Sequence, residues 1–158
     1  MRIGGQLFHS TDWCFQECAK ILPKSLSKIK MSTDYDIFGG KEFFLNLVKD
    51  FYQEIVNDPL LKPMYPEDDL DGAIERLTLF LMQYWGGPET YSELRGHPRL
   101  RMRHTAFPID FAARDSWLRN MAAALDKQEI TEENRTKLWN YLQMAADSMV
   151  NTRTDGII

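Results

Sequence analysis

Cysteine and histidine are scarce in this sequence of 158 residues. It has two Cys, Cys14 and Cys18, and three His. A zinc or iron–sulfur site takes three or four such side chains per metal, so the composition argues against sites of that kind. Because residues 31–158 contain no Cys, no disulfide can belong to their fold, and we expect a reducing compartment, the cytoplasm.

Long apolar runs and an excess of basic charge are also missing. No run approaches the roughly 18 apolar residues that span a bilayer, and the N-terminus has no stretch resembling a secretory signal. Of 19 basic and 23 acidic side chains, residues 1–30 hold five and two, which leaves 14 basic and 21 acidic, a net charge of −7, for the remainder. A region with this excess of acidic residues binds the phosphate groups of nucleic acids poorly. We predict neither an integral membrane segment nor a nucleic-acid partner.

The common catalytic signatures are absent too. The sequence has no Gly-x-Ser-x-Gly, no phosphate-binding glycine loop and no His-Glu-x-x-His. It also has no flavin or nicotinamide motif, so redox turnover would need electrons from an external reductase.

Aromatic residues, in contrast, are plentiful: nine Phe, six Tyr and four Trp. The length is that of one domain and is enough to bury a core without disulfides. Haem is the metal centre that this composition can still support, because the porphyrin supplies four nitrogens and the protein needs one axial ligand, usually His. The aromatics would then line an apolar slot, although an ordinary core fits their number equally well.

Helical periodicity runs through most of the chain after residue 40. Apolar residues recur every three or four positions over 41–56, and again from Leu70 to the stop at Gly86-Gly87-Pro88. Two further helices are expected after caps at Asp110 and Thr131. The segment 89–108 has weak periodicity, with a short helix expected over 99–106. The pattern predicts an all-α protein of about four substantial helices.

The least periodic segment contains a run of arginines and a single His. Taken alone, His104 reads as an ordinary surface or core residue. The arginines could form a solvent-exposed surface. Alternatively, their planar guanidinium groups could pair with the carboxylates of a cofactor. A haem-free helical interaction module that uses the run is a further alternative. The run comprises Arg95, Arg99, Arg101 and Arg103.

Four ordered motifs carry a family resemblance. They are Tyr65-Pro-Glu-Asp-Asp-Leu70, Phe80-Leu-Met-Gln-Tyr-Trp-Gly-Gly-Pro88, Gly96-His-Pro-Arg-Leu-Arg-Met-Arg-His104 and Arg114-Asp-Ser-Trp-Leu118. With them, about residues 36–152 resemble the group II truncated haemoglobins. The resemblance implies a truncated globin fold, a two-over-two helical sandwich around haem.

The resemblance also implies roles for individual residues. His104 would be the proximal ligand of the iron of haem b, while Tyr52 and Trp117 would donate hydrogen bonds to a diatomic ligand. Ala73, a small residue where many globins have a distal His, should leave a side entrance to the haem. Three kinds of position complete the expected pocket: Tyr65 after the first connector, Leu77 and Met82 in the lining, and Arg76, Tyr91 and Arg103 at the haem propionates.

The implied function is reversible binding of O₂, and of NO, CO or peroxide, in a pocket of Tyr and Trp donors. The alternative is a haem oxidoreductase for NO dioxygenation or peroxide chemistry, supplied by an external reductase. The oligomeric state stays open.

Residues 1–30 differ from the rest in charge and cysteine content. We expect them to be an N-terminal extension, either an appended tail or the product of an upstream start assignment. Met31 is a plausible first residue of a compact globin, so the globin domain is predicted to span 31–158.

Overall fold

The computed structural model describes residues 32–65 and 69–152, and the predicted N-terminal extension lies outside them. The described residues are helical and contain no strand. None of their helices combines the length and hydropathy of a membrane span. The elements are α2 (Asp34–Phe38), α3 (Gly40–Ile55), the 3-10 helix η2 (Lys62–Met64), α4 (Leu70–Tyr84), α5 (Thr90–Arg95), α6 (Leu100–Arg103), α7 (Phe111–Asp126) and α8 (Glu132–Met149).

The ends of the long helices follow from local side-chain chemistry. The Asp110 carboxylate accepts a hydrogen bond from the N–H of Ala113 at 2.8 Å, and the Thr131 hydroxyl accepts one from the N–H of Asn134 at 3.4 Å. Both predicted caps are therefore confirmed. At the end of α4, a Cβ on Gly87 would lie 2.7 Å from the carbonyl oxygen of Met82. Glycine is thus required where the chain turns back so closely on the helix.

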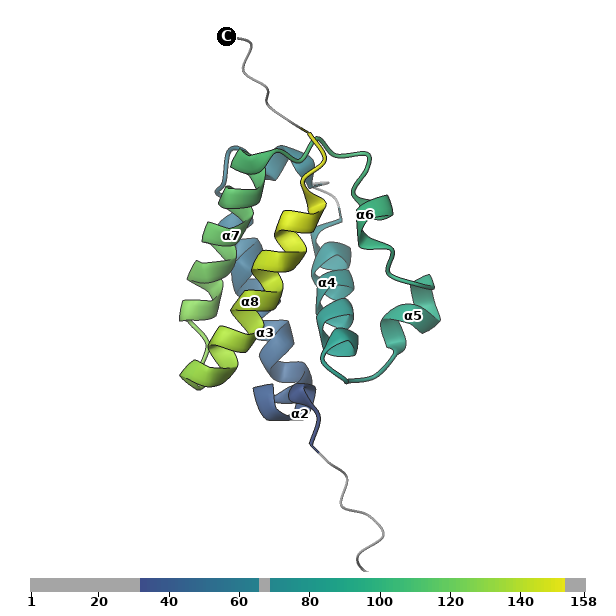
Figure 1. Cartoon of the computed structure of the whole chain (residues 1–158), viewed down its shortest axis with the longest axis vertical. Helices are drawn as coiled ribbons and strands as arrows, with labels where there is room; N and C mark the ends of the chain where they lie inside the picture. The colour runs from purple at the N-terminus through teal and green to yellow at the C-terminus, as the bar shows by residue number, and fades with distance from the viewer. Residues whose placement is uncertain (1–31, 66–68, 153–158) are drawn as a thin grey trace, which may run out of the picture. The chain divides into compact units, whose positions relative to one another are not determined.

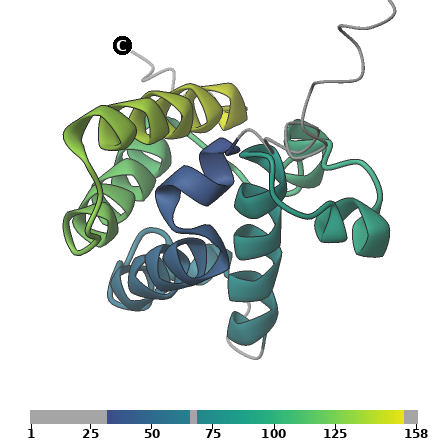
Figure 2. The same ribbon diagram turned by 90° about the horizontal axis from the view of Figure 1, so that it is seen from below.

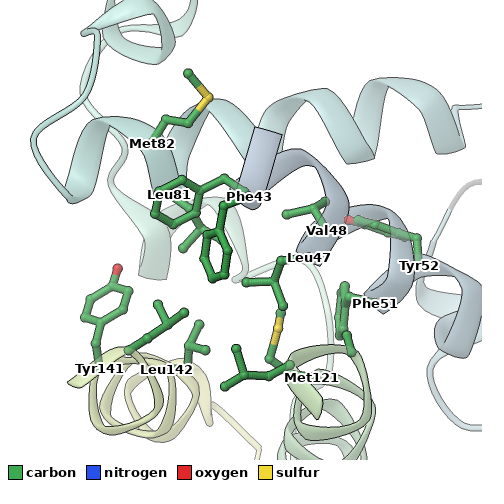
Figure 3. Close-up of a cluster of buried hydrophobic side chains, with 14 of the residues drawn as sticks. Phe43, Leu47, Val48, Phe51, Tyr52, Leu81, Met82, Met121, Tyr141 and Leu142 are labelled. Atoms are coloured by element: carbon green, nitrogen blue, oxygen red, sulfur yellow. The ribbon is translucent and has the colours of Figure 1, made fainter. Parts of the chain in front are cut away.

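The four long helices form two packed pairs. Helix α3 packs against α4 and α7, and α7 packs against α8. Figure 1 shows α8 crossing in front of α3, with α7 on one side and α4 on the other. This arrangement is the predicted two-over-two sandwich. Fully buried side chains of all four helices fill its centre, among them Phe44, Leu47, Phe51, Leu81, Met121, Leu138 and Leu142 (Figure 3).

The short helices α5 and α6 lie on the far side of α4 from α3 (Figures 1 and 2). Gln83 and Ser92 exchange two hydrogen bonds, of 2.7 and 2.9 Å, and so tie the end of α4 to α5. The helix expected over 99–106 is shorter than predicted, because α6 ends at Arg103. His104 therefore lies directly after the helix, at its carboxyl end.

Candidate functional site

A cavity of about 440 Å³ lies among side chains of the helices α3 to α8 and of the connector after α3. Its lining is predominantly apolar, with a few polar groups. A cavity of this kind is the usual form of a small-molecule or cofactor site. Lining residues that the sequence interpretation did not single out include Leu61, Met64, Phe80, Leu81, Leu100, Phe107, Tyr141, Leu142, Ala145 and Met149.

The structure brings nine of the ten predicted site residues to this cavity. They come from five helices, α3 to α7, and from two loops that are far apart in sequence. The nine are Tyr52, Tyr65, Ala73, Arg76, Leu77, Tyr91, Arg103, His104 and Trp117.

Met82 is the exception, since it does not line the cavity and is buried in the core instead. The cavity-facing residues of α4 recur at the helical spacing, from Ala73 through Leu77 to Leu81. Each residue of an α-helix turns about 100° from the one before it, so Met82 points away from the face that carries Leu81. Figure 3 shows Met82 pointing away from the residues around Leu81.

The imidazole of His104 is oriented by a backbone carbonyl. Its Nδ1 lies 2.8 Å from the carbonyl oxygen of Leu100. Because a carbonyl can only accept, Nδ1 carries the proton and donates it. In the neutral imidazole, Nε2 is then the nitrogen with the free lone pair, as a metal ligand requires.

Asn151 supports the loop that carries His104, a role that the sequence interpretation missed. Its side-chain amide donates to the carbonyl oxygens of His104 at 3.1 Å and Phe107 at 2.9 Å. Its amide oxygen accepts from the N–H of Ile109 at 2.9 Å. A lone Asn just beyond a helix carries no recognisable pattern, so sequence alone offers no signal for this contact.

Three aromatic side chains with N–H or O–H donors gather at the cavity from separate elements. The rings of Tyr52 and Tyr65 meet edge to face, with centroids 5.5 Å apart, and the ring of Phe51 lies 5.2 Å from both Tyr52 and Trp117. Burial raises the pKa of Tyr65 to about 12, although the indole N–H of Trp117 partly opposes the rise. Burial also raises the pKa of Tyr52, and the nearby Tyr65 adds to the effect. Both phenols therefore stay protonated near neutral pH and can donate.

A polar cluster beside this aromatic group joins the connector after α3 to α7. The carboxylate of Asp58 accepts hydrogen bonds from the hydroxyl of Ser116 and, at 2.7 Å, from the amide of Asn120. It also accepts from the N–H groups of Leu60 and Leu61. We call Asp58, Ser116 and Asn120 the Asp58 clip. The clip thereby fixes Leu61, which lines the cavity, relative to Ser116, which directly precedes Trp117 in the chain.

Four arginines line the cavity, and three of them, Arg76, Arg103 and Arg114, are held in place by other groups. Arg76 pairs with Asp69 at 2.7 Å across Gly72, where a Cβ would lie 2.1 Å from Asp69 Oδ1. Arg103 donates from Nε to the carbonyl oxygen of Pro98 and from Nη2 to that of Arg95, both at 2.8 Å. Arg103 thus keeps Nη1 for a further partner while it joins α5 to α6. Arg95 also lines the cavity.

These residues fit a flat, apolar group that carries an iron and peripheral carboxylates. The walls are mainly aliphatic and aromatic, one neutral imidazole offers a free lone pair, and arginines supply partners for carboxylates. The fold and the site together define a helical haem-binding protein of the globin type.

The comparisons with known proteins agree with this class. Residues 33–151 match the model of the bacterial-like globin family. The group 2 truncated haemoglobin YjbI of Bacillus subtilis is 42% identical over 112 residues, which cover 71% of this chain and 84% of that protein. The chain belongs to the bacterial-like globin family, as a group II truncated haemoglobin.

Two solved structures show the same fold. A thermostable haemoglobin from the actinobacterium Thermobifida fusca is 54% identical, with a TM-score of 0.74 over 76% of this chain and 98% of that chain. A truncated oxygen-avid haemoglobin from Bacillus subtilis is 40% identical, with a TM-score of 0.72 over 76% of this chain and all of that one. As a truncated globin, the protein takes haem with its iron as cofactor and small gases such as O₂ as ligands.

Proposed function

We propose that His104 is the axial ligand of the haem iron and that Tyr52, Tyr65 and Trp117 retain a diatomic ligand, O₂ above all, in the cavity. The observation that carries the proposal is the His104 imidazole, which enters the cavity with Nδ1 on a carbonyl and Nε2 free, in the same space as three aromatic donors. The oxygen-avid relative from Bacillus subtilis supports O₂ as the ligand.

When bound, haem supplies an iron with one open position for a diatomic ligand. The residues of the protein orient the axial imidazole, exclude water and bind the ligand. The Leu100 carbonyl sets the tautomer of His104, the apolar walls exclude water, and Tyr and Trp donate hydrogen bonds to the ligand. We assign Arg76, Arg103 and Tyr91 to the haem propionates and Leu77 to the wall. Ala73, a small residue, leaves the approach along α4 open.

The axial ligand is tested by absorption spectroscopy of purified protein reconstituted with haemin. We expect His104→Ala to lose the Soret spectrum of native ligation. The matched control is His97→Ala, because His97 is exposed and does not line the cavity. Native ligation retained in the His104 variant, or lost equally in both, would contradict the assignment.

The donors are tested by O₂ dissociation in stopped flow. A net hydrogen bond contributes about 0.5–1.5 kcal/mol, so we expect Tyr52→Phe, Tyr65→Phe and Trp117→Phe each to speed O₂ release by about two- to tenfold. Tyr35→Phe is the control, since that hydroxyl lies outside the cavity. Unchanged rates in all three variants would refute retention by these donors.

The alternative, NO dioxygenation or peroxide turnover with an external reductase, uses the same cavity. Steady consumption of NO or peroxide with a physiological electron donor would establish it. A haem protein that binds O₂ tightly but shows no such turnover would be a binder only.

A further inference from the structure

A basic surface without acidic neighbours in sequence lies at the edge of the cavity, on α5, α6 and the loops beside them. Residues 94–109 contain no acidic side chain, whereas the rest of 31–158 holds ten basic and 21 acidic ones. Four exposed arginines therefore give this segment a charge of +4, with His neutral, inside a region whose net charge is −7. We call these four residues the arginine rim: Arg95, Arg99, Arg101 and Arg103.

None of the four guanidinium groups pairs with a carboxylate of another described residue. Arg103 donates to two backbone carbonyls, which carry no net charge, and the other three form no ion pair within the described residues. Basic side chains of other helices do form ion pairs, as Arg76 does with Asp69. Arg99 and Arg101 also do not line the cavity, so the carboxylates of a bound cofactor do not neutralise them. The rim therefore keeps its positive charge for a partner outside the molecule.

Large apolar side chains are exposed among these arginines. Leu94 on α5 is 67% exposed, and Met102 on α6 is 65% exposed. Every basic residue of the segment apart from His is Arg, and residues 63–126 contain no Lys at all. Protein–protein interfaces are enriched in Arg and Met and depleted in Lys, whereas an anionic membrane attracts Lys and Arg alike. The composition thus favours a protein partner over a lipid surface.

We propose that the arginine rim docks a small, acidic iron–sulfur protein of the ferredoxin class, which reduces the iron of the bound haem. The inference rests on the proposed haem site. One electron leaves the reduced cluster of the donor, and the haem iron accepts it and passes from ferric to ferrous. No atom or proton has to move between the two proteins, so the step is balanced.

The place of the rim suits delivery of an electron to the cavity. Arg95 and Arg103 belong to the rim and also line the cavity, and His104 follows Arg103 directly. Helices α5 and α6 lie on the outer side of α4, where a partner can approach them (Figure 2). A protein seated on the rim is therefore next to the cofactor site. The sequence has no flavin or nicotinamide motif, so the electron has to come from such an external donor.

The size and charge of the rim fit a brief encounter. Helix α5 has six residues and α6 has four, so the contact is small, as in transient electron-transfer complexes. The acidic remainder of the molecule repels an acidic partner, while the rim attracts it, and this contrast orients the approach. Because exposed charges are screened by salt, docking should weaken as the ionic strength rises.

Docking is tested with the full-length, haem-loaded protein and an immobilised, oxidised plant-type ferredoxin as the probe. No electron passes in this arrangement, so surface plasmon resonance reports binding alone. We expect binding at about 20 mM salt and its loss at about 0.5 M. The double variant Arg99→Gln/Arg101→Gln should bind about tenfold more weakly at low salt. The matched control is Lys41→Gln/Lys49→Gln, which removes the same charge from exposed positions of α3.

Electron transfer is tested in stopped flow with reduced ferredoxin, and carbon monoxide traps the ferrous product. We expect the arginine double variant to be reduced about tenfold more slowly at low salt and at the rate of the wild type at high salt. Photoreduced deazariboflavin, an uncharged small reductant, should reduce wild type and both double variants equally. Loss of the Soret band in the wild-type protein would contradict the proposed haem site, which the binding test does not depend on.

Equal ferredoxin binding and equal reduction rates in the two double variants would refute the proposal. Two further measurements examine other occupants of the rim: cosedimentation with vesicles of phosphatidylglycerol and phosphatidylcholine, and sedimentation velocity of the protein alone. If only vesicle binding or only self-association depended on Arg99 and Arg101, the rim would bind a membrane or a second copy of the chain. Either result would overturn the assignment to an acidic donor protein.

Discussion

Asn151 shows how a side chain outside the cavity governs the geometry within it. Its amide satisfies the carbonyl oxygens of His104 and Phe107 and the N–H of Ile109, three backbone groups of the loop after α6. The loop contributes His104 and Phe107 to the cavity. The position of the imidazole therefore depends on a residue more than 40 positions further along the chain.

We expect Asn151→Ala to lower the free energy of unfolding by about 1.5–4.5 kcal/mol, because it removes three hydrogen bonds that each contribute about 0.5–1.5 kcal/mol. The loosened loop should also release haem faster. Urea denaturation measures the first effect, and transfer of haem to an apoglobin scavenger measures the second. Asn140→Ala, at an exposed position of α8, is the control. Equal haem loss in the two variants would contradict this role.

At the scale of elements, the Asp58 clip joins the connector after α3 to α7, a helix that is distant in sequence. Burial opposes the charged form of Asp58, but hydrogen bonds from Ser116, from Asn120 and from the N–H groups of Leu61 and Leu60 together outweigh it and lower the pKa to about 2. A carboxyl whose pKa is lower in the folded state stabilises the fold above its unfolded pKa, near 3.8. That contribution is lost as the pH falls toward 2.

Between about pH 4 and pH 2, the free energy of unfolding of Asp58→Asn should therefore fall less steeply than that of the wild-type protein. Its stability near neutral pH should be lower, because the charge-assisted hydrogen bonds are gone. Thermal unfolding as a function of pH measures both effects. Glu129→Gln, in the exposed loop between α7 and α8, is the control. Parallel pH profiles for wild type and Asp58→Asn would show that the clip does not contribute.

The long helices could be predicted from sequence because each repeats its signal over several turns. The core face of α3, for instance, contains Phe44, Leu47 and Phe51 at helical spacing. Helix α2 was not predicted, since five residues are too few to show a period. Met82 was placed wrongly in the pocket because its apolar character does not reveal which side of the helix it faces. Contacts such as those of Asn151 and Asp58 depend on tertiary packing and leave no pattern in the sequence.

At the scale of the whole molecule, the core of the two-over-two sandwich borders the cavity, which α3, α4, α7 and α8 line together with α5 and α6. Helices α3 and α7 pack directly together, whereas α5 and α6 lie beyond α4 and next to the cavity (Figure 1). Large apolar side chains of this outer segment, Leu94 and Met102, are exposed. The residues proposed to bind the cofactor could be predicted from the family motifs, but their convergence on one cavity is a property of the fold alone.

Removal of haem should therefore lower the melting temperature and loosen the molecule unevenly. A ligand that binds only the folded state stabilises it, and an empty cavity of about 440 Å³ loses the packing contacts of its lining. Hydrogen exchange with and without haem measures the effect. We expect the largest rise in exchange in α5 and α6 and the smallest in α3 and α7. A uniform rise along the chain would contradict this division.

The carbonyl partner of His104 has one more consequence, which concerns electron density. A carboxylate at Nδ1 would pull the proton toward itself and give the imidazole imidazolate character, whereas the neutral oxygen of Leu100 does so far less. As the proposed axial ligand, this less electron-rich imidazole would favour the reduced form of the iron, which is the form that binds O₂. At the proposed haem site, one backbone oxygen would thus bias the chemistry toward holding a ligand intact.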